Sequence, residues 1–112
     1  MTKTNLMEML LVIPEEITSA ELEVLGVEVR LLEAKETLRR VENTVLLGGA
    51  LDGKNERVRE AQLAELTERE LATVAILRVE AVVAATQLRI LQTRLAALQA
   101  VATLLTGGRQ GG

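Results

Sequence analysis

The sequence predicts an all-α protein: a long antiparallel helical hairpin with a short helix after the turn, coiled-coil-like and assembling into a multi-helix bundle. Two long stretches repeat apolar residues at heptad spacing, and a glycine-containing turn separates them. The chain has 112 residues, of which 48% are hydrophobic and 26% charged. This composition is typical of a folded chain, and the length allows one domain with a modest core.

The N-terminal segment, residues 1–13, is apolar but carries Glu8 and is followed by Pro14 and two glutamates. A signal peptide would need an uninterrupted apolar core and a small-residue cleavage site, so we do not expect one. We expect the hairpin domain to cover residues 14–106, with the first 13 residues outside it. Whether that segment is a helix, a strand or an arm is left open by its sequence.

The first helix is expected at about residues 15–47. Proline suits the first turn of a helix, where its missing N–H has no partner, and the acids that follow favour the positive end of the helix dipole. Gly26 lies inside this helix, and we expect a close contact with another helix there. The seam repeats every seven residues at Ile17, Val24, Leu31, Leu38 and Val45, and three residues later at Ala20, Val27, Ala34 and Val41.

A turn and a short helix follow. Gly48 and Gly49 are expected to end the first helix, because glycine adopts the left-handed conformation found at helix ends. Asn55 has the position of an N-cap for a helix over residues 56–66. The pattern from Thr67 to Glu70 resembles a capping box, so we expect the chain to bend there and start a new helix.

The last helix is expected at about residues 68–105, ended by Gly107 and Gly108, with residues 107–112 as a flexible tail. It is apolar on two sides, which indicates two neighbours. The main seam contains Val74, Leu77, Ala81, Ala84, Leu88, Leu91, Leu95, Leu98, Ala102 and Leu105. The second stripe, on the opposite side, contains Ile76, Val79, Val83, Ile90, Ala97, Val101 and Leu104.

The second stripe predicts self-association. One antiparallel partner buries only one face of a helix, so the other face needs the N-terminal segment, a second copy of the chain, or both. Leaving five or six such side chains in water forgoes roughly 1.5–3 kcal/mol for each. We therefore expect a homo-oligomer whose interface contains Ile76, Val79, Val83, Ile90, Val101 and Leu104.

The residues that are missing exclude most enzyme chemistry. The chain has no His, no Cys and no aromatic residue, and it has a single serine and a single aspartate. Without these residues we expect no catalytic residue, no cofactor, no metal site and no base-stacking surface. The chain is therefore expected not to be an enzyme.

The charges argue against an electrostatic nucleic-acid binder. Net charge is −3, and it is uneven: residues 1–56 have 6 basic and 11 acidic side chains, and residues 57–112 have 7 and 5. Arg78, Glu80, Arg89 and Arg94 interrupt the most apolar region, so no charge-free stretch of about 20 residues exists. We expect a soluble protein with no membrane partner. Because cysteine is absent, a cytoplasmic location is the default.

The turn, Gly48–Asn55, differs from a phosphate-binding loop at one decisive place. Asn55 stands where a serine or threonine hydroxyl would hold Mg²⁺, and the loop follows a helix instead of a strand. Nucleotide hydrolysis is therefore not expected. Free N–H groups at a helix start can still hold an anion such as a nucleic-acid phosphate. The candidate contacts are Lys54, Asn55, Arg57 and Arg59.

From the turn to Leu63 (DGKNERVREAQL), the sequence resembles a class of small helical-hairpin proteins encoded by phages and prophages, with a Gly-Lys-Asn turn and no assigned activity. The resemblance covers roughly residues 20–105, although the rest is generic coiled-coil composition. It implies a phage accessory protein made in the host cytoplasm, and it carries over no catalytic residue. A place in the virion stays open.

These observations predict a non-enzymatic accessory protein that acts as a protein-interaction or structural module through self-association. Its partner would be its own copies, or a phage or host protein. Three alternatives remain. One is an accessory protein of nucleic-acid metabolism that contacts phosphate at the turn, and another is an inhibitor of a host protein. The third is an enzyme, which would need a reactive centre supplied by a cofactor.

Overall fold

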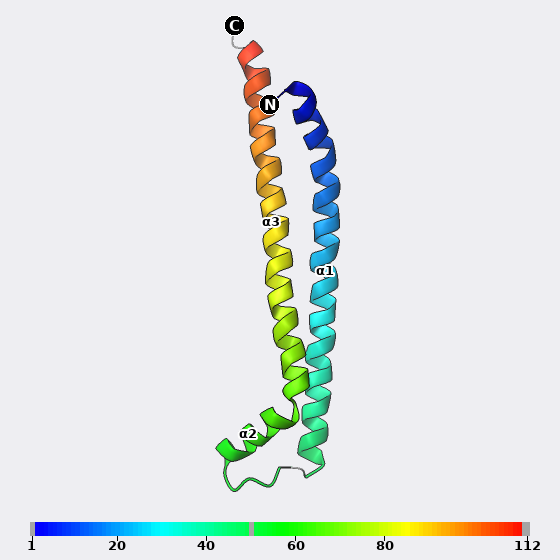
Figure 1. The fold of residues 1–112 in the computed structure, drawn as a ribbon, viewed down its shortest axis with the longest axis vertical. Coiled ribbons are helices and arrows are strands. Elements are labelled where there is room, and N and C mark those ends of the chain that lie inside the picture. Colours follow the sequence, from blue (N-terminus) through cyan, green and yellow to red (C-terminus); the bar gives the residue numbers. More distant parts are fainter. Residues whose placement is uncertain (1, 50, 111–112) are drawn as a thin grey trace. The chain divides into compact units, whose positions relative to one another are not determined.

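The computed structural model describes residues 2–49 and 51–110, and these residues form helices and connecting turns without a strand. Three helices follow one another in Figure 1: α1 (Lys3–Leu47), α2 (Glu56–Leu66) and α3 (Glu68–Gln110). The chain divides into two compact units. Unit 1 combines residues 1–25 with residues 82–112, and unit 2 contains residues 26–81. In each unit a stretch of α1 packs against a stretch of α3.

The start of α1 corrects the predicted start near residue 15. The helix begins at Lys3, so the segment taken as separate from the hairpin is, in its described residues, part of the helix. Thr2 caps it: its hydroxyl oxygen accepts from the Asn5 N–H (3.2 Å), and its carbonyl accepts from the Leu6 N–H (3.1 Å). The heptad seam continues backwards through Leu10 and Ile13, and burial of that seam favours the longer helix.

Pro14 therefore lies inside α1 and not at its first turn. Proline in a helix interior removes the N–H that would bond to the carbonyl four residues earlier, here that of Leu10. Its own carbonyl still accepts a hydrogen bond from the Thr18 hydroxyl (3.1 Å). Pro14 is exposed, whereas Ile13 beside it is buried, so the helix keeps its core contact across the missing bond.

The connection between α1 and α2 is built from local hydrogen bonds. After Leu47 the chain turns at Gly48 and Gly49, and Gly49 has a φ of 68°, a conformation that favours glycine. Asn55 caps α2, since its side-chain oxygen accepts from the Val58 N–H at 2.9 Å. The Gly53 N–H donates to the side-chain oxygen of Gln62 at 3.0 Å, which joins the loop to α2.

Thr67 separates α2 from α3. It is fully buried, and its hydroxyl donates to the Leu63 carbonyl (2.8 Å), while its carbonyl accepts from the Leu71 N–H (2.9 Å). The chain does break here as expected, but the Thr67 side chain bonds to the end of α2 and not to the start of α3. The helix break is therefore a C-cap of α2.

The C-terminal end of α3 also differs from the prediction. The helix runs through Gly107 to Gln110, so residues 107–110 are helical and not a flexible tail, and residues 111–112 lie outside the described residues. Glycine ends a helix when it adopts a positive φ, and the described glycine with a positive φ is Gly49. With helical φ and ψ, a glycine costs only about 1 kcal/mol relative to alanine.

Each unit has a small core. In unit 1 the core joins the beginning of α1 to the last turns of α3, and its buried members are Leu6, Ile13 and Leu98. Four partly buried side chains pack against them: Leu10, Ile17, Leu95 and Ala102. In unit 2 the buried residues are Val27, Thr67 and Val74. The space next to Gly26 is open, with no atom within 4 Å of an added Cβ, so the close contact expected there is not made within the chain.

Candidate interaction surface

The main seam of α3 is the covered side of that helix. Val74, Ala84 and Leu98 are buried. Six further seam residues are half-buried: Leu77, Ala81, Leu88, Leu91, Leu95 and Ala102. Leu105, the last position of the seam, is exposed. The heptad spacing therefore identified the face of α3 that packs against α1.

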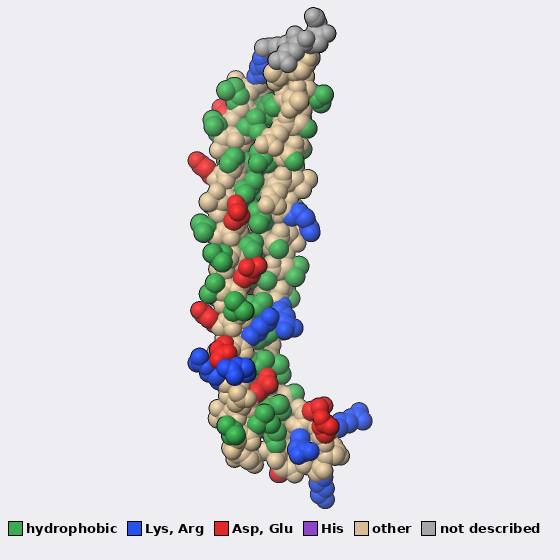
Figure 2. Space-filling view, turned by 180° about the vertical axis from the view of Figure 1, so that it is seen from behind, with side chains coloured by type: hydrophobic (Ala, Val, Ile, Leu, Met, Phe, Trp, Pro, Cys, Tyr) green, Lys and Arg blue, Asp and Glu red, His purple; other side chains and the backbone are tan. Residues whose placement is uncertain are grey.

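The second stripe of α3 lies in solvent. Its large side chains are exposed over 38–75% of their surface, and Val82 next to it is exposed as well. Val83, Ile90, Val101 and Leu104 belong to unit 1, and Ile76 and Val79 belong to unit 2. Over unit 1, Figure 2 shows hydrophobic side chains along the outer edges as well as along the line where the two helices meet. The chain on its own covers only one of the two apolar sides.

The outer side of α1 is apolar too. In unit 1, Met7, Leu11, Leu22 and Leu25 are exposed. In unit 2, Val29 and Leu32 continue this pattern. Exposed apolar residues at single positions are ordinary, but rows at helical spacing mark surfaces that bind another molecule.

Unit 1 also has a shallow groove of about 720 Å³. Six of the residues that line it come from α1 and one comes from α3: Asn5, Glu8, Met9, Val12, Ile13, Glu16 and Arg94. Within α1, Asn5, Met9, Val12 and Glu16 follow at intervals of four, three and four, which places them on one face. The groove is therefore apolar in its middle, with carboxylates on α1 and a guanidinium on α3.

The sequence prediction missed the α1 side of this groove. It separated residues 1–13 from the first helix because Pro14 followed them, so Met9 and Val12 had no assigned face. One signal was present: counting the heptad backwards from Ile17 places Leu10, Ile13 and Leu6 on the seam. Asn5, Met9, Val12 and Glu16 then occupy the face next to it.

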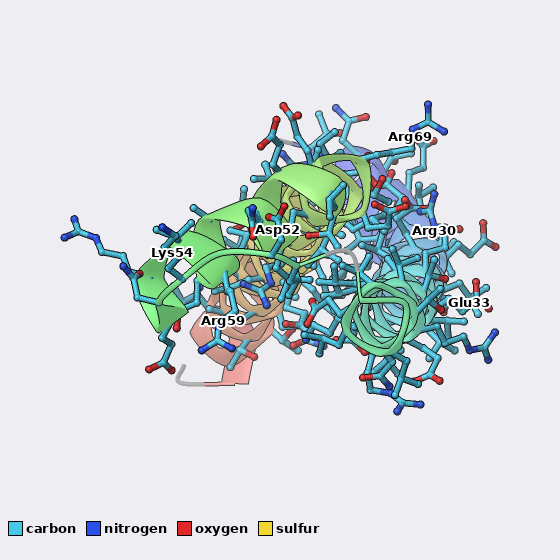
Figure 3. The ribbon with its side chains drawn as sticks, turned by 90° about the horizontal axis from the view of Figure 1, so that it is seen from below. Arg30, Glu33, Asp52, Lys54, Arg59 and Arg69 are labelled. Atoms are coloured by element: carbon cyan, nitrogen blue, oxygen red, sulfur yellow. The ribbon has the colours of Figure 1, made fainter. Side chains whose placement is uncertain are left out.

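The four candidate anion contacts lie in the turn and in the first turns of α2, but they do not form a basic pocket. Asn55 and Arg57 line a hollow together with Glu56 and Glu60, whose carboxylates repel an anion. The Asn55 side chain already accepts the Val58 N–H. Figure 3 shows Lys54, from the loop, and Arg59, from α2, at separate places at this end of the chain. The carboxylate of Asp52 accepts a hydrogen bond from the Gln62 side chain (2.5 Å).

A cluster of ion pairs occupies the surface of α1 in unit 2. Arg39 donates two hydrogen bonds to Glu36 (2.6 and 3.0 Å), and Arg40 donates a third (3.3 Å). These bonds, those from Arg39 above all, hold the pKa of Glu36 below its ordinary value of 4.5, and they raise the pKa of Arg39. The groups are solvent-exposed and three or four residues apart in one helix, so they act as ordinary surface pairs.

Over the residues that the structure describes, no group of three or more His, Cys, Asp or Glu side chains is placed to hold a metal ion. In the same residues one helix, over Glu68–Gly107, is long and apolar enough by length and composition to cross a membrane. Its most apolar 18-residue window has a mean hydropathy of 1.6, and 11% of that window is buried. A helix with two apolar stripes has this composition whether protein or lipid covers the second stripe.

Comparison with protein-family models, with curated proteins and with solved structures finds no match.

Proposed function

We propose that this chain is a non-enzymatic interaction or structural module that works by self-association: a coiled-coil-like helical hairpin whose second apolar side joins it to further copies in a multi-helix bundle. The observation that carries the proposal is the exposed second stripe of α3. On α3 the main seam is covered, whereas the second stripe is exposed. This difference supports a second partner helix that lies outside the chain.

The energetics favour an assembly over a single chain. Burying a large aliphatic side chain contributes roughly 1.5–3 kcal/mol. The stripe has six such side chains, and the whole net stability of a small domain is about 5–15 kcal/mol. The cores of the two units are small, with few fully buried residues in each. Covering the stripe therefore adds an amount comparable to the stability of the isolated chain.

The wider role that we propose is that of a phage-type accessory protein in the host cytoplasm, following the resemblance of the turn sequence. Contacts with a phage or host protein would use the same apolar side. For a nucleic-acid role at the turn, the mixed charges around Asn55 and Arg57 offer little support. Salt-sensitive binding of single-stranded DNA would favour that role, and a stable one-to-one complex with a host protein would favour inhibition.

The test compares two pairs of substitutions in unit 1. Val83→Glu with Ile90→Glu places charge on the second stripe, and Leu88→Glu with Leu91→Glu places the same charges on the main seam. The stripe pair should dissociate the assembly and leave most of the helicity, because both positions are exposed and neither belongs to the core of unit 1. The seam pair should unfold the chain. Light scattering reads the mass, and circular dichroism reads the helicity.

If both pairs of substitutions have the same effect on mass and helicity, the assignment of two separate faces is wrong. If the stripe pair leaves the mass of an assembly unchanged, the assembly uses another surface.

A further inference from the structure

We infer that the groove in unit 1 receives α3 from a second copy of this chain, placed so that the basic α3 of each copy lies along the acidic α1 of the other. This inference rests on the proposed self-association and names the surfaces that meet.

The groove and the exposed stripe belong to the same side of α3. Ile90, Arg94, Ala97, Val101 and Leu104 follow at intervals of four, three, four and three, so they share one helix face. Arg94 lines the groove, and the apolar members of that row are exposed. The stripe therefore shares a face of α3 with the one α3 residue that lines the groove, Arg94, and a helix placed along this face would cover both.

The occupant is identified by charge. In unit 1 the α1 stretch has five glutamates (Glu8, Glu15, Glu16, Glu21 and Glu23) and one lysine. The α3 stretch, residues 82–112, has three arginines and no acidic residue. At the groove itself the charged side chains are Glu8 and Glu16 of α1 and Arg94 of α3. Pairing two α3 helices by this face brings Arg94 to Arg94, and pairing two α1 helices brings glutamates together. Only the crossed pairing, α3 on α1, joins opposite charges on both sides.

A twofold dimer satisfies this pairing twice. In a symmetric dimer each contact is made in both directions, so Arg94 of each copy faces the α1 groove residues of the other, Glu8 and Glu16. The apolar middle of the groove, Met9 and Val12, then meets the stripe residues Ile90 and Val101. Ser19, a small residue, follows Val12 on this α1 face at an interval of seven and allows close approach.

The test makes the α3 side of the proposed contact acidic in one variant and the α1 side basic in another, and then mixes the two proteins. One variant carries Arg94→Glu together with Gln87→Glu, an exposed position seven residues earlier on the same face of α3. The other variant carries Glu8→Arg and Glu16→Arg. Each alone should weaken the homodimer by about tenfold or more, because like charges then meet. An equimolar mixture should restore an assembly with one copy of each variant, seen by native mass spectrometry. An ion pair within one chain cannot be restored by mixing.

A matched control changes charge by the same amount on another face of α3. Arg89→Glu with Gln92→Glu lies about 140° and 160° around the helix from Arg94. This pair should leave the dimer unchanged. Circular dichroism checks that each variant is helical, and the wild type gives a second readout: added salt should raise the dissociation constant of a crossed dimer and lower that of a dimer with like charges in contact.

The outcomes separate the two proposals. A wild-type chain that stays a folded monomer overturns self-association and this inference together. A wild-type assembly that the Gln87→Glu/Arg94→Glu variant forms equally well, that mixing does not restore, or that salt strengthens, overturns the crossed pairing alone.

Discussion

Individual side chains decide where α2 begins and ends. The helix contains no buried residue, so packing contributes little to it, and its bounds depend on the Asn55 cap and on Thr67. Gly53 is fixed in the same way: a Cβ added there would lie 2.8 Å from the Val58 side chain. The loop and α2 are therefore held by a few hydrogen bonds and one tight contact.

Replacing Asn55 with alanine should destabilise α2 by about 1 kcal/mol, since the Val58 N–H loses its acceptor. Hydrogen exchange would show faster exchange of the amides in Glu56–Leu66, with α1 and α3 unaffected. Asn55→Asp keeps an acceptor oxygen and serves as the control. Equal protection of α2 in the wild type and the alanine variant would mean that the cap does not hold this helix.

Glu36 gives a prediction about pH. Its pKa is lowered in the folded chain by the hydrogen bonds from Arg39, so the ion pair stabilises the folded state above the ordinary pKa of 4.5. That contribution is lost as the pH falls from 4.5 through the lowered value. In Arg39→Gln, NMR titration should find the pKa of Glu36 closer to 4.5. An unchanged titration midpoint would show that Arg39 is not the cause.

Some of this residue-level detail was readable in the sequence, and some was not. Asn55 before an acidic residue and the Gly48-Gly49 pair are local signals, and their effects are local. Thr67 could be read as a break, but its full burial in unit 2 could not. Burial depends on residues distant in sequence, and a local pattern does not contain them.

At the scale of elements, Pro14 and the buried seam have opposite effects on the stability of α1. Pro14 disfavours a helix interior by about 3 kcal/mol. Against this, the continued seam buries Leu6 and Ile13 with Leu98. The helix continues through the proline because these contacts outweigh the missing hydrogen bond.

Pro14→Ala should therefore raise the free energy of unfolding, by up to about 3 kcal/mol. The substitution returns an N–H to the Leu10 carbonyl and leaves the core of unit 1 in place. Urea denaturation followed by circular dichroism measures the change. Leu98→Ala is the opposite control and should cost about 2–5 kcal/mol. A less stable Pro14→Ala variant would indicate that the helix does not cross this position in solution.

The long helices also show which structural features a heptad pattern can predict. The heptad count identified the covered face of α3 correctly. The face of a helix on which residues lie depends only on their spacing, and the spacing of apolar residues can be read from the sequence. The predicted ends of the long helices were wrong, at Lys3 and at Gln110. Pro14 lies inside α1 because the seam on both sides of it is covered, and Gly107 lies inside α3 without the positive φ that ends a helix. The groove in unit 1 was missed, since Met9 and Val12 lie in the part of α1 that was left out.

At the scale of the whole molecule, the chain has more apolar helix surface than it covers. The second stripe was predicted from the sequence, and the structure finds its members exposed. We propose that a second copy of the chain covers them. The groove in unit 1 supports this choice, because its α1 side is acidic and its α3 side carries Arg94. Assembly would then complete a core that the single chain leaves open.

The most direct test is the mass of the folded wild-type protein in solution, measured by sedimentation equilibrium over a range of concentrations. A single chain has a mass of 12.2 kDa. The proposed self-association requires a helical species at a whole multiple of this mass that dissociates on dilution. A cooperatively folded species that stays at 12.2 kDa at every concentration would contradict it.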